Sequence, residues 1–202
     1  MNGMCGRACC FQDSANTNDM HYFFKHANMQ IKQLQVAYAP EHDRILMRIN
    51  SSENQEVRVW LTRRMVRMLI PSLDEMMQKL LASDRPLNDA GRKALLEMSR
   101  EVSLYSADFK SPFQDKNTTT PLGADPLLIT QIELRPSGEA HNTDLVLKLV
   151  AGSGKGFEMR MAEQLQHGFA DLLIKTCGQA DWGLHFKSTS SIIERPETRH
   201  LN

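Results

Sequence analysis

Residues 44–61 read RILMRINSSENQEVRVWL, and they decide the fold class. On either side of the polar residues 50–54, large apolar side chains alternate with residues that are mostly charged. The alternating apolar positions are Ile45, Met47 and Ile49, then Val57, Val59 and Leu61. A period of two predicts β-strands with one buried face, and the polar break predicts a turn. We therefore expect a β-hairpin here.

The sequence on both sides extends this hairpin into a larger unit. Residues 31–38 alternate in the same way and end at a turn over residues 39–43, which predicts another strand. After the hairpin, Thr62 is a suitable N-cap for a helix over residues 63–81. The helix has an apolar stripe that we expect to be buried, formed by Met65, Met68, Leu69, Leu73, Met76, Met77 and Leu80. Pro71 lies inside this stripe, and we expect a kink or a break near it.

The same order of patterns recurs in residues 127–178. Residues 144–161 read DLVLKLVAGSGKGFEMRM, with apolar positions 100 residues after those of the first hairpin. The strand before them matches at an offset of 98, and a helix over residues 162–176 ends at Gly178. The pattern predicts an α+β protein of two tandem βββα units, with a mainly antiparallel sheet and helices packed on it. Either one continuous sheet or two facing sheets, with helices on the outside, satisfies the pattern. Coincidence of two common strand-helix patterns is the alternative to a duplication.

The remaining segments have simpler patterns. A middle helix over residues 88–105 places Ala94, Leu95, Met98, Val102 and Tyr105 on one face, which we expect to pack on the sheet. We interpret residues 106–126 as a long exposed linker and residues 182–186 as a short last strand. The expected organisation is a flexible N-terminal tail at 1–28, a first unit at 29–83, the middle helix and linker at 84–126, a second unit at 127–187 and a flexible C-terminal tail at 188–202.

Composition limits the classes of function. The 202 residues include 24 basic and 24 acidic side chains, so no overall positive charge favours nucleic acid or an anionic membrane. No apolar run is long enough to cross a bilayer, and the N-terminus lacks the apolar core of a secretory signal. Three of the four cysteines lie within the first ten residues, which is not typical of a disulfide framework. We therefore expect a cytoplasmic protein without membrane contact.

The N-terminal cysteines and histidines have a spacing that resembles a zinc site. Cys5, Cys9, His21 and His26 approximate the ligand spacing of a two-Cys, two-His finger. The apolar core residues of a finger are missing between the two pairs, and Cys10 offers a competing ligand. We interpret the segment as a tail, keep these four residues as a weak metal candidate and predict no cofactor.

Other chemical signals are weaker. Residues 152–156 read GSGKG and resemble a phosphate loop, but no Ser or Thr follows the lysine and a strand pattern comes next, so we interpret them as a hairpin turn. We interpret His42, His141, His167 and His185 as isolated surface histidines.

Arginines gather at the start of the first helix. Arg63, Arg64 and Arg67 lie where the helix dipole disfavours positive charge, so they invite an anionic partner. Together with Arg58 they form a candidate site for a phosphate, a nucleic-acid backbone or an acidic protein surface. Solvation along the helix, or pairing with nearby carboxylates, is the alternative.

The face of the sheet opposite the core is unusually apolar. Leu46 and Trp60 in the first unit, and Val146 and Val150 in the second, point away from the core positions. Arg48 and Arg58 flank Trp60, a composition typical of interface hot spots. Either the middle helix covers this face or another protein contacts it.

No catalytic motif is present, such as a Gly-x-Ser-x-Gly elbow or a His-Glu-x-x-His helix. This absence, with the apolar residues on both sheet faces, favours a non-catalytic protein-interaction module, an adaptor or assembly factor. Its expected partner is another protein or a second copy of the chain. An anion-binding or nucleic-acid-binding protein that uses the arginine cluster is the alternative, and an enzyme with a site built from distant residues is the third hypothesis.

Overall fold

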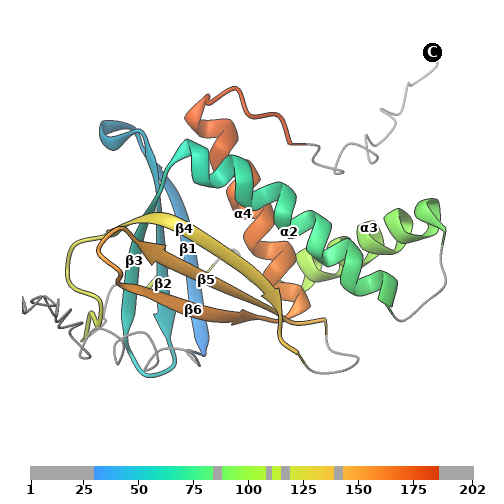
Figure 1. The fold of residues 1–202 in the computed structure, drawn as a ribbon, viewed down its shortest axis with the longest axis horizontal. Helices are drawn as coiled ribbons and strands as arrows, with labels where there is room; N and C mark the ends of the chain where they lie inside the picture. Colours follow the sequence, from blue (N-terminus) through green and yellow to red (C-terminus); the bar gives the residue numbers. More distant parts are fainter. Residues whose placement is uncertain (1–29, 84–87, 108–110, 115–118, 139–142, 187–202) are drawn as a thin grey trace, which may run out of the picture.

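The computed structural model describes residues 30–83, 88–107, 111–114, 119–138 and 143–186. The elements along the chain are β1 (Ile31–Ala39), the 3-10 turn η1 (Pro40–His42), β2 (Arg44–Ser51), β3 (Glu56–Leu61), α2 (Arg63–Ser83), α3 (Asp89–Ser106), β4 (Leu127–Pro136), β5 (Leu145–Ala151), β6 (Gly156–Met161) and α4 (Glu163–Ala180). The α+β class predicted from the sequence is confirmed (Figure 1).

The strands form one mixed sheet in the order β1-β2-β3-β4-β5-β6. All neighbours are antiparallel except β3 and β4, which are parallel and pair only at Val59 with Leu127 and at Trp60 with Leu128. Beyond these two pairs β4 diverges from β3, and the two halves of the sheet run in different directions (Figure 1). The sequence allowed one continuous sheet or two facing sheets, and the strands form one continuous hydrogen-bonded sheet.

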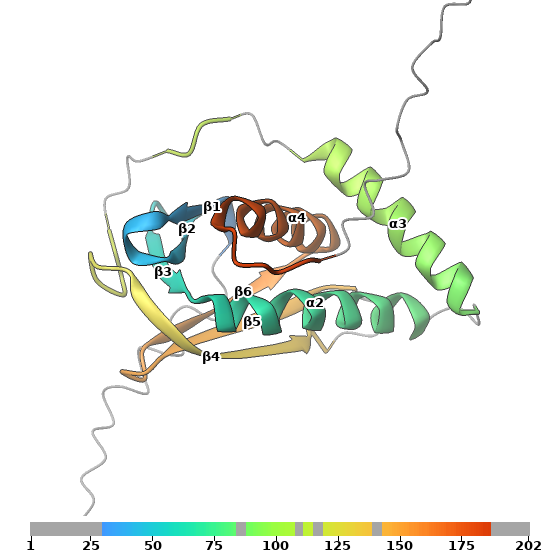
Figure 2. The same cartoon turned by 90° about the horizontal axis from the view of Figure 1, so that it is seen from above.

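Helices α2 and α4 lie on one face of this sheet (Figure 2). Helix α2 follows β3 in the sequence but packs along β4, whereas α4 follows β6 and packs along β1 (Figure 2). The apolar faces of both halves turn toward the helices and form a single core with them. Because the two halves of the sheet run in different directions, both can bury their apolar faces against the same pair of helices.

Helix α2 begins as the sequence predicts but has no break. The hydroxyl of Thr62 accepts a hydrogen bond of 3.3 Å from the backbone N–H of Met65, as an N-cap does. The helix continues through Pro71, whose ring is exposed, while Leu69 and Leu73 on either side are buried. Burial of this face on the sheet compensates for the hydrogen bond that proline cannot donate.

Helix α3 packs against α2 and α4, and not against the sheet as we expected. Asn88 caps it, since its side-chain oxygen accepts a hydrogen bond of 2.8 Å from the N–H of Gly91. Polar contacts fix the side that faces α4: Ser99 donates to Glu163, and Arg100 pairs with Asp171 at 3.2 Å. The predicted apolar face therefore points elsewhere.

Parts of the segment between α3 and β4 lie on the outer face of β1–β3. The ring of Phe113 lies 4.4 Å from the guanidinium carbon of Arg48. The backbone N–H of Glu56 donates to the carbonyl of Thr119 at 2.9 Å. Phe113 and Thr119 of the expected linker therefore contact this face, while most described residues of the segment are exposed.

Residues 182–186 do not form the predicted last strand. Trp182 is buried, and Leu184 and Phe186 pack against the core as irregular chain. No helix in the described part of the chain is long and apolar enough to cross a membrane.

Candidate functional site

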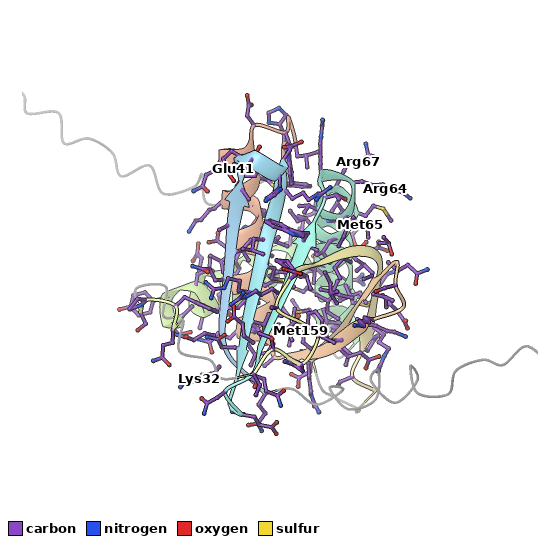
Figure 3. All side chains as sticks on the ribbon, turned by 90° about the vertical axis from the view of Figure 1, so that its left-hand side faces the viewer. Lys32, Glu41, Arg64, Met65, Arg67 and Met159 are labelled. Atoms are coloured by element: carbon purple, nitrogen blue, oxygen red, sulfur yellow. The ribbon has the colours of Figure 1, made fainter. Side chains whose placement is uncertain are left out.

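The start of α2 presents three arginines to solvent. Arg63, Arg64 and Arg67 are exposed, and the first turn of the helix has no acidic residue. Figure 3 shows Arg64 and Arg67 near the start of α2. Within the described residues none of the three makes an ion pair. The structure therefore places these three predicted residues together, as a positively charged surface at a helix N-terminus.

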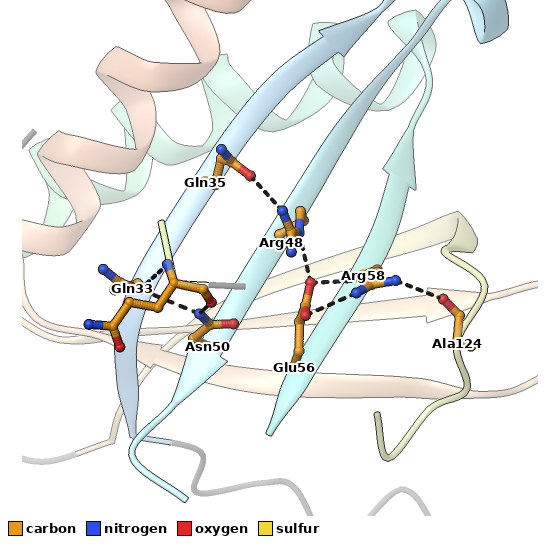
Figure 4. Close-up of polar contacts among 8 residues, drawn as sticks. Gln33, Gln35, Arg48, Asn50, Glu56, Arg58 and Ala124 are labelled. Carbon is orange, nitrogen blue, oxygen red and sulfur yellow. Dashed lines mark hydrogen bonds and ion pairs between the residues drawn. The ribbon is translucent and has the colours of Figure 1, made fainter. Parts of the chain in front are cut away.

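The two strand arginines of the predicted site are engaged within the chain (Figure 4). Nε of Arg48 and Nε of Arg58 each donate to Oε1 of Glu56 at 2.7 Å. Arg48 also donates to the side-chain oxygen of Gln35 at 3.3 Å, and Arg58 donates to the carbonyl of Ala124 at 3.3 Å. These contacts hold both guanidinium groups on the outer face of the sheet.

The carboxylate of Glu56 is the centre of this network. Burial by itself raises its pKa, but the hydrogen bonds from Arg58 and Arg48 and the positive charges of both groups outweigh burial and lower the pKa to about 2. One buried carboxylate thus compensates charge on two arginines. Since Arg48 and Arg58 are neighbours across the β2–β3 pair, Glu56 relieves a repulsion that the strand register imposes.

Trp60, the predicted hot-spot residue, is half-buried. Its ring centroid lies 5.0 Å from that of His42 at an interplanar angle of 57°. Part of its apolar surface is thus covered by the turn between β1 and β2.

The outer face of β4–β6 carries ion pairs, and one of them spans β5 from β4 to β6. Arg135 pairs with Glu158 at 3.1 Å, and Arg160 pairs with Asp144 at 2.7 Å. The register places Val146 between Arg135 and Arg160, and Val146 is buried. The aliphatic stems of long charged residues can cover an apolar side chain in this way.

A groove follows the open edge of β4 beside α2. Two adjoining hollows form it, of about 540 Å³ and about 240 Å³, and Met68 and Ile132 line both. Met68 is 53% exposed, which corrects the sequence interpretation that the residue is part of the core. The buried face of α2 includes Val66 and Ile70, which were not in the predicted stripe, and Met68 lies on the rim of the groove. We call this groove the α2–β4 groove.

The outer side of α3 carries the three large apolar side chains with the highest exposed fractions in the described chain. Met98 is 60% exposed, Val102 63% and Tyr105 96%. Their spacing of four and three residues places them in one row along the helix. We call these three residues the α3 stripe. The sequence predicted that they share a face, but it predicted that the sheet covers that face.

A polar cluster between α3 and α4 was not found from the sequence. His167 is buried, although we interpreted it as a surface residue, and it lies near Glu163 and Arg100. Burial lowers its pKa, with Glu163 acting in the opposite direction. Asp171 is also buried and pairs with Arg100. The signal in the sequence was the four-residue spacing of Glu163, His167 and Asp171 on one face of a helix.

A further hollow, of about 1130 Å³, lies between β1, residues 111–114 and α4. Its charged lining residues are Lys32 and Arg160, and its described lining includes no carboxylate, imidazole or thiol.

The metal candidate Cys5, Cys9, His21 and His26 lies outside the described residues. Within the described ranges no group of three His, Cys, Asp or Glu residues is arranged to hold a metal ion. Residues 152–155 form a tight hairpin turn, in which the N–H of Ala151 donates to the carbonyl of Lys155 at 2.8 Å, as interpreted from the sequence.

Comparisons with protein-family models, with curated proteins and with solved structures gave no match.

Proposed function

We propose that the protein is a non-catalytic protein-interaction module that contacts its partner through the α3 stripe. The carrying observation is the exposure of Met98, Val102 and Tyr105 in one row. Exposed apolar side chains scattered singly are ordinary, but a row of three large ones on one helix is typical of a contact surface. The polar contacts of Ser99 and Arg100 hold the opposite side of the helix and fix the direction in which the stripe points.

The partner that fits this stripe is an amphipathic helix of another protein. Leu95, Met98, Val102 and Tyr105 follow the alternating three- and four-residue spacing of a coiled-coil seam. A facing helix with the same spacing inserts its apolar side chains between them. Glu101 lies on the flank of this row and is exposed, whereas Lys93 lies on the other side of the helix, seven residues before Arg100. A facing helix with a basic residue opposite Glu101 complements this flank.

The test is affinity purification of the full-length protein from its native host, followed by quantitative mass spectrometry. The variant Val102→Glu with Tyr105→Glu alters only exposed side chains, and Lys93→Ser is the matched control on the same helix. We expect wild type and control to recover the same protein and the double variant to lose it by roughly tenfold, because charge is then placed in the apolar contact. Equal recovery of every protein by all three forms contradicts the proposal.

A second copy of the chain could also occupy the α3 stripe, and this case must be distinguished from a partner protein. Light scattering after size-exclusion chromatography measures it directly. A dimer that is lost only in the double variant assigns the stripe to a second copy and contradicts the proposed partner.

The anion-binding alternative is favoured by a different observation. Arg63, Arg64 and Arg67 are exposed at a helix N-terminus and make no ion pair among the described residues. Binding of a fluorescent single-stranded oligonucleotide that falls steeply with salt, and is lost in Arg63→Glu with Arg64→Glu, supports this function. Under this alternative the α3 variant binds the oligonucleotide as wild type does.

We also propose that the two βββα segments arose by duplication. In support, the register shifts of the first strands lie at Ile31/Gln33 and at Ile129/Gln131. The hairpin turns have positive φ at Asn54 and at Gly154, 100 residues later. Irregular features at matching positions are a stronger sign of common origin than shared alternation, because alternation recurs in any half-buried strand.

A further inference from the structure

The α2–β4 groove has an open strand edge along its floor. Strand β4 pairs with β5 along one side, but on the other side only Leu127 and Leu128 pair with β3. Past these residues β3 has turned into α2, and residues 129–136 have no strand neighbour on that side within the described chain. Alternate residues of a strand direct N–H and C=O groups to each edge, so this edge presents a row of backbone donors and acceptors.

Helix α2 forms the wall of the groove. Its half-exposed methionines, Met68 and Met76, line the groove opposite Ile132 and Leu134 of β4. Methionine side chains adapt to different apolar partners because they are unbranched and polarisable. A strand laid on the edge of β4 points every second side chain toward this wall.

The end of the groove near the start of α2 is positively charged. Arg64 and Lys148 line it, together with the single carboxylate Glu133, which lies 3.5 Å from Lys148. Arg63 and Arg67 lie on the adjoining turns and add to the positive potential. The other end is close to neutral, since Glu75 and Lys79 pair there at 2.6 Å.

We propose that the α2–β4 groove binds an extended peptide of a partner protein by strand addition to β4. The peptide has apolar side chains at alternate positions facing Met68 and Met76, and an acidic residue at the end beside Arg64 and Lys148. Backbone hydrogen bonds to β4 supply affinity, and the side-chain positions supply specificity. This site is separate from the α3 stripe, so it does not depend on the proposed function.

The experiment selects binders from a display library of random ten-residue peptides on the full-length protein, and measures a selected peptide by fluorescence anisotropy. We expect alternating apolar positions and an acidic residue near one end. Methylation of the peptide nitrogens whose N–H groups point toward β4 abolishes binding, because these nitrogens can no longer donate hydrogen bonds. Methylation of the alternate nitrogens, which point away from β4, preserves binding. Hydrogen exchange shows slower exchange of amide protons in β4 when the peptide is bound.

Variants at exposed positions locate the site. Arg64→Glu and Met68→Glu weaken the peptide by about fivefold or more, because they reverse the charge at one end and place charge in the apolar wall. The matched control Arg67→Glu lies outside the lining of the groove and changes affinity less than Arg64→Glu. If a substitution prevents folding, the methylated peptides still decide the question on the wild-type protein.

Three results overturn the proposal. One is a library that yields no peptide whose binding depends on the phase of methylation. Another is protection of β1 or β6 in place of β4. The third is an equal loss with Arg64→Glu and Arg67→Glu, which indicates an anion surface without strand addition. The variant Val102→Glu with Tyr105→Glu leaves peptide affinity unchanged if the two sites are separate.

Discussion

The indole N–H of Trp182 donates a hydrogen bond of 2.6 Å to Oδ1 of Asp43, a residue 139 positions earlier in the chain. The hydroxyl of Tyr38 donates to the same oxygen at 2.9 Å, and the rings of Tyr38 and Trp182 meet edge to face at 5.9 Å. The hydrogen bonds from Trp182 and Tyr38 lower the pKa of Asp43. This contact attaches the segment after α4 to the turn between β1 and β2.

We predict that Trp182→Phe and Asp43→Ala each lower the midpoint of thermal unfolding. Trp182→Phe keeps an aromatic ring but removes the donor, and Asp43→Ala removes the acceptor of both hydrogen bonds. The double variant is expected to lose less than the sum of the two single losses, because both remove one interaction. Asp125→Ala, an exposed carboxylate on another loop, is the control, and additive losses contradict the coupling.

The sequence predicted elements well because their signals are local. Alternation marked Ile45, Met47 and Ile49 as one buried face, and all three are buried. The exchange of helices between the two halves depends on the parallel pairing of Val59 with Leu127, which no local pattern records.

The candidate site was predicted only in part for a similar reason. Periodicity indicated that Met98 and Val102 share a face, but what covers a face depends on distant segments. Likewise, Arg48 and Arg58 were interpreted as binding residues. Their pairing with a carboxylate depends on the strand register, which the sequence alone does not give. Glu56 reaches both only because β2 and β3 pair Arg48 with Arg58.

The buried carboxylate of Glu56 is predicted to make the protein sensitive to acid. Its pKa is about 2 in the folded protein against 4.5 ordinarily, so its stabilising effect is fully present above about pH 4.5 and is lost as pH falls toward 2. A shift of this size corresponds to about 3 kcal/mol. Urea unfolding at pH 7 should show a loss of this order for Glu56→Gln, and the difference from wild type should shrink at pH 3. If the free energy of unfolding differs between wild type and Glu56→Gln by the same amount at both pH values, the carboxylate of Glu56 is not the cause of the acid sensitivity.

The buried imidazole of His167 is predicted to give a second pH dependence. Burial lowers its pKa below the ordinary 6.5; the charge of Glu163 opposes this, Arg100 acts in the same direction as burial, and Asp74 opposes it. The unfolded chain therefore binds more protons, and stability decreases as pH falls below about 6.5. His167→Gln should therefore reduce the pH dependence of the free energy of unfolding below about pH 6.5. An unchanged slope in His167→Gln shows that another group titrates there.

Two glycines of the second half are predicted to respond in opposite ways to alanine. At Gly156 a Cβ atom would lie 2.3 Å from the carbonyl oxygen of Leu149 and 3.0 Å from Cα of Val150, so the β5–β6 pair has no room for it. Because the obstructing atoms belong to the backbone, we expect Gly156→Ala to destabilise the protein by several kcal/mol or to prevent folding.

Gly178 lies within the last turn of α4, where a Cβ meets nothing within 4 Å. Alanine there removes conformational freedom from the unfolded chain without strain, so we expect Gly178→Ala to stabilise by about 0.5–1 kcal/mol. Chemical denaturation of both variants against wild type measures the two effects. Since the substitutions are chemically identical, a similar loss at both positions would show that backbone contact at Gly156 is not the cause.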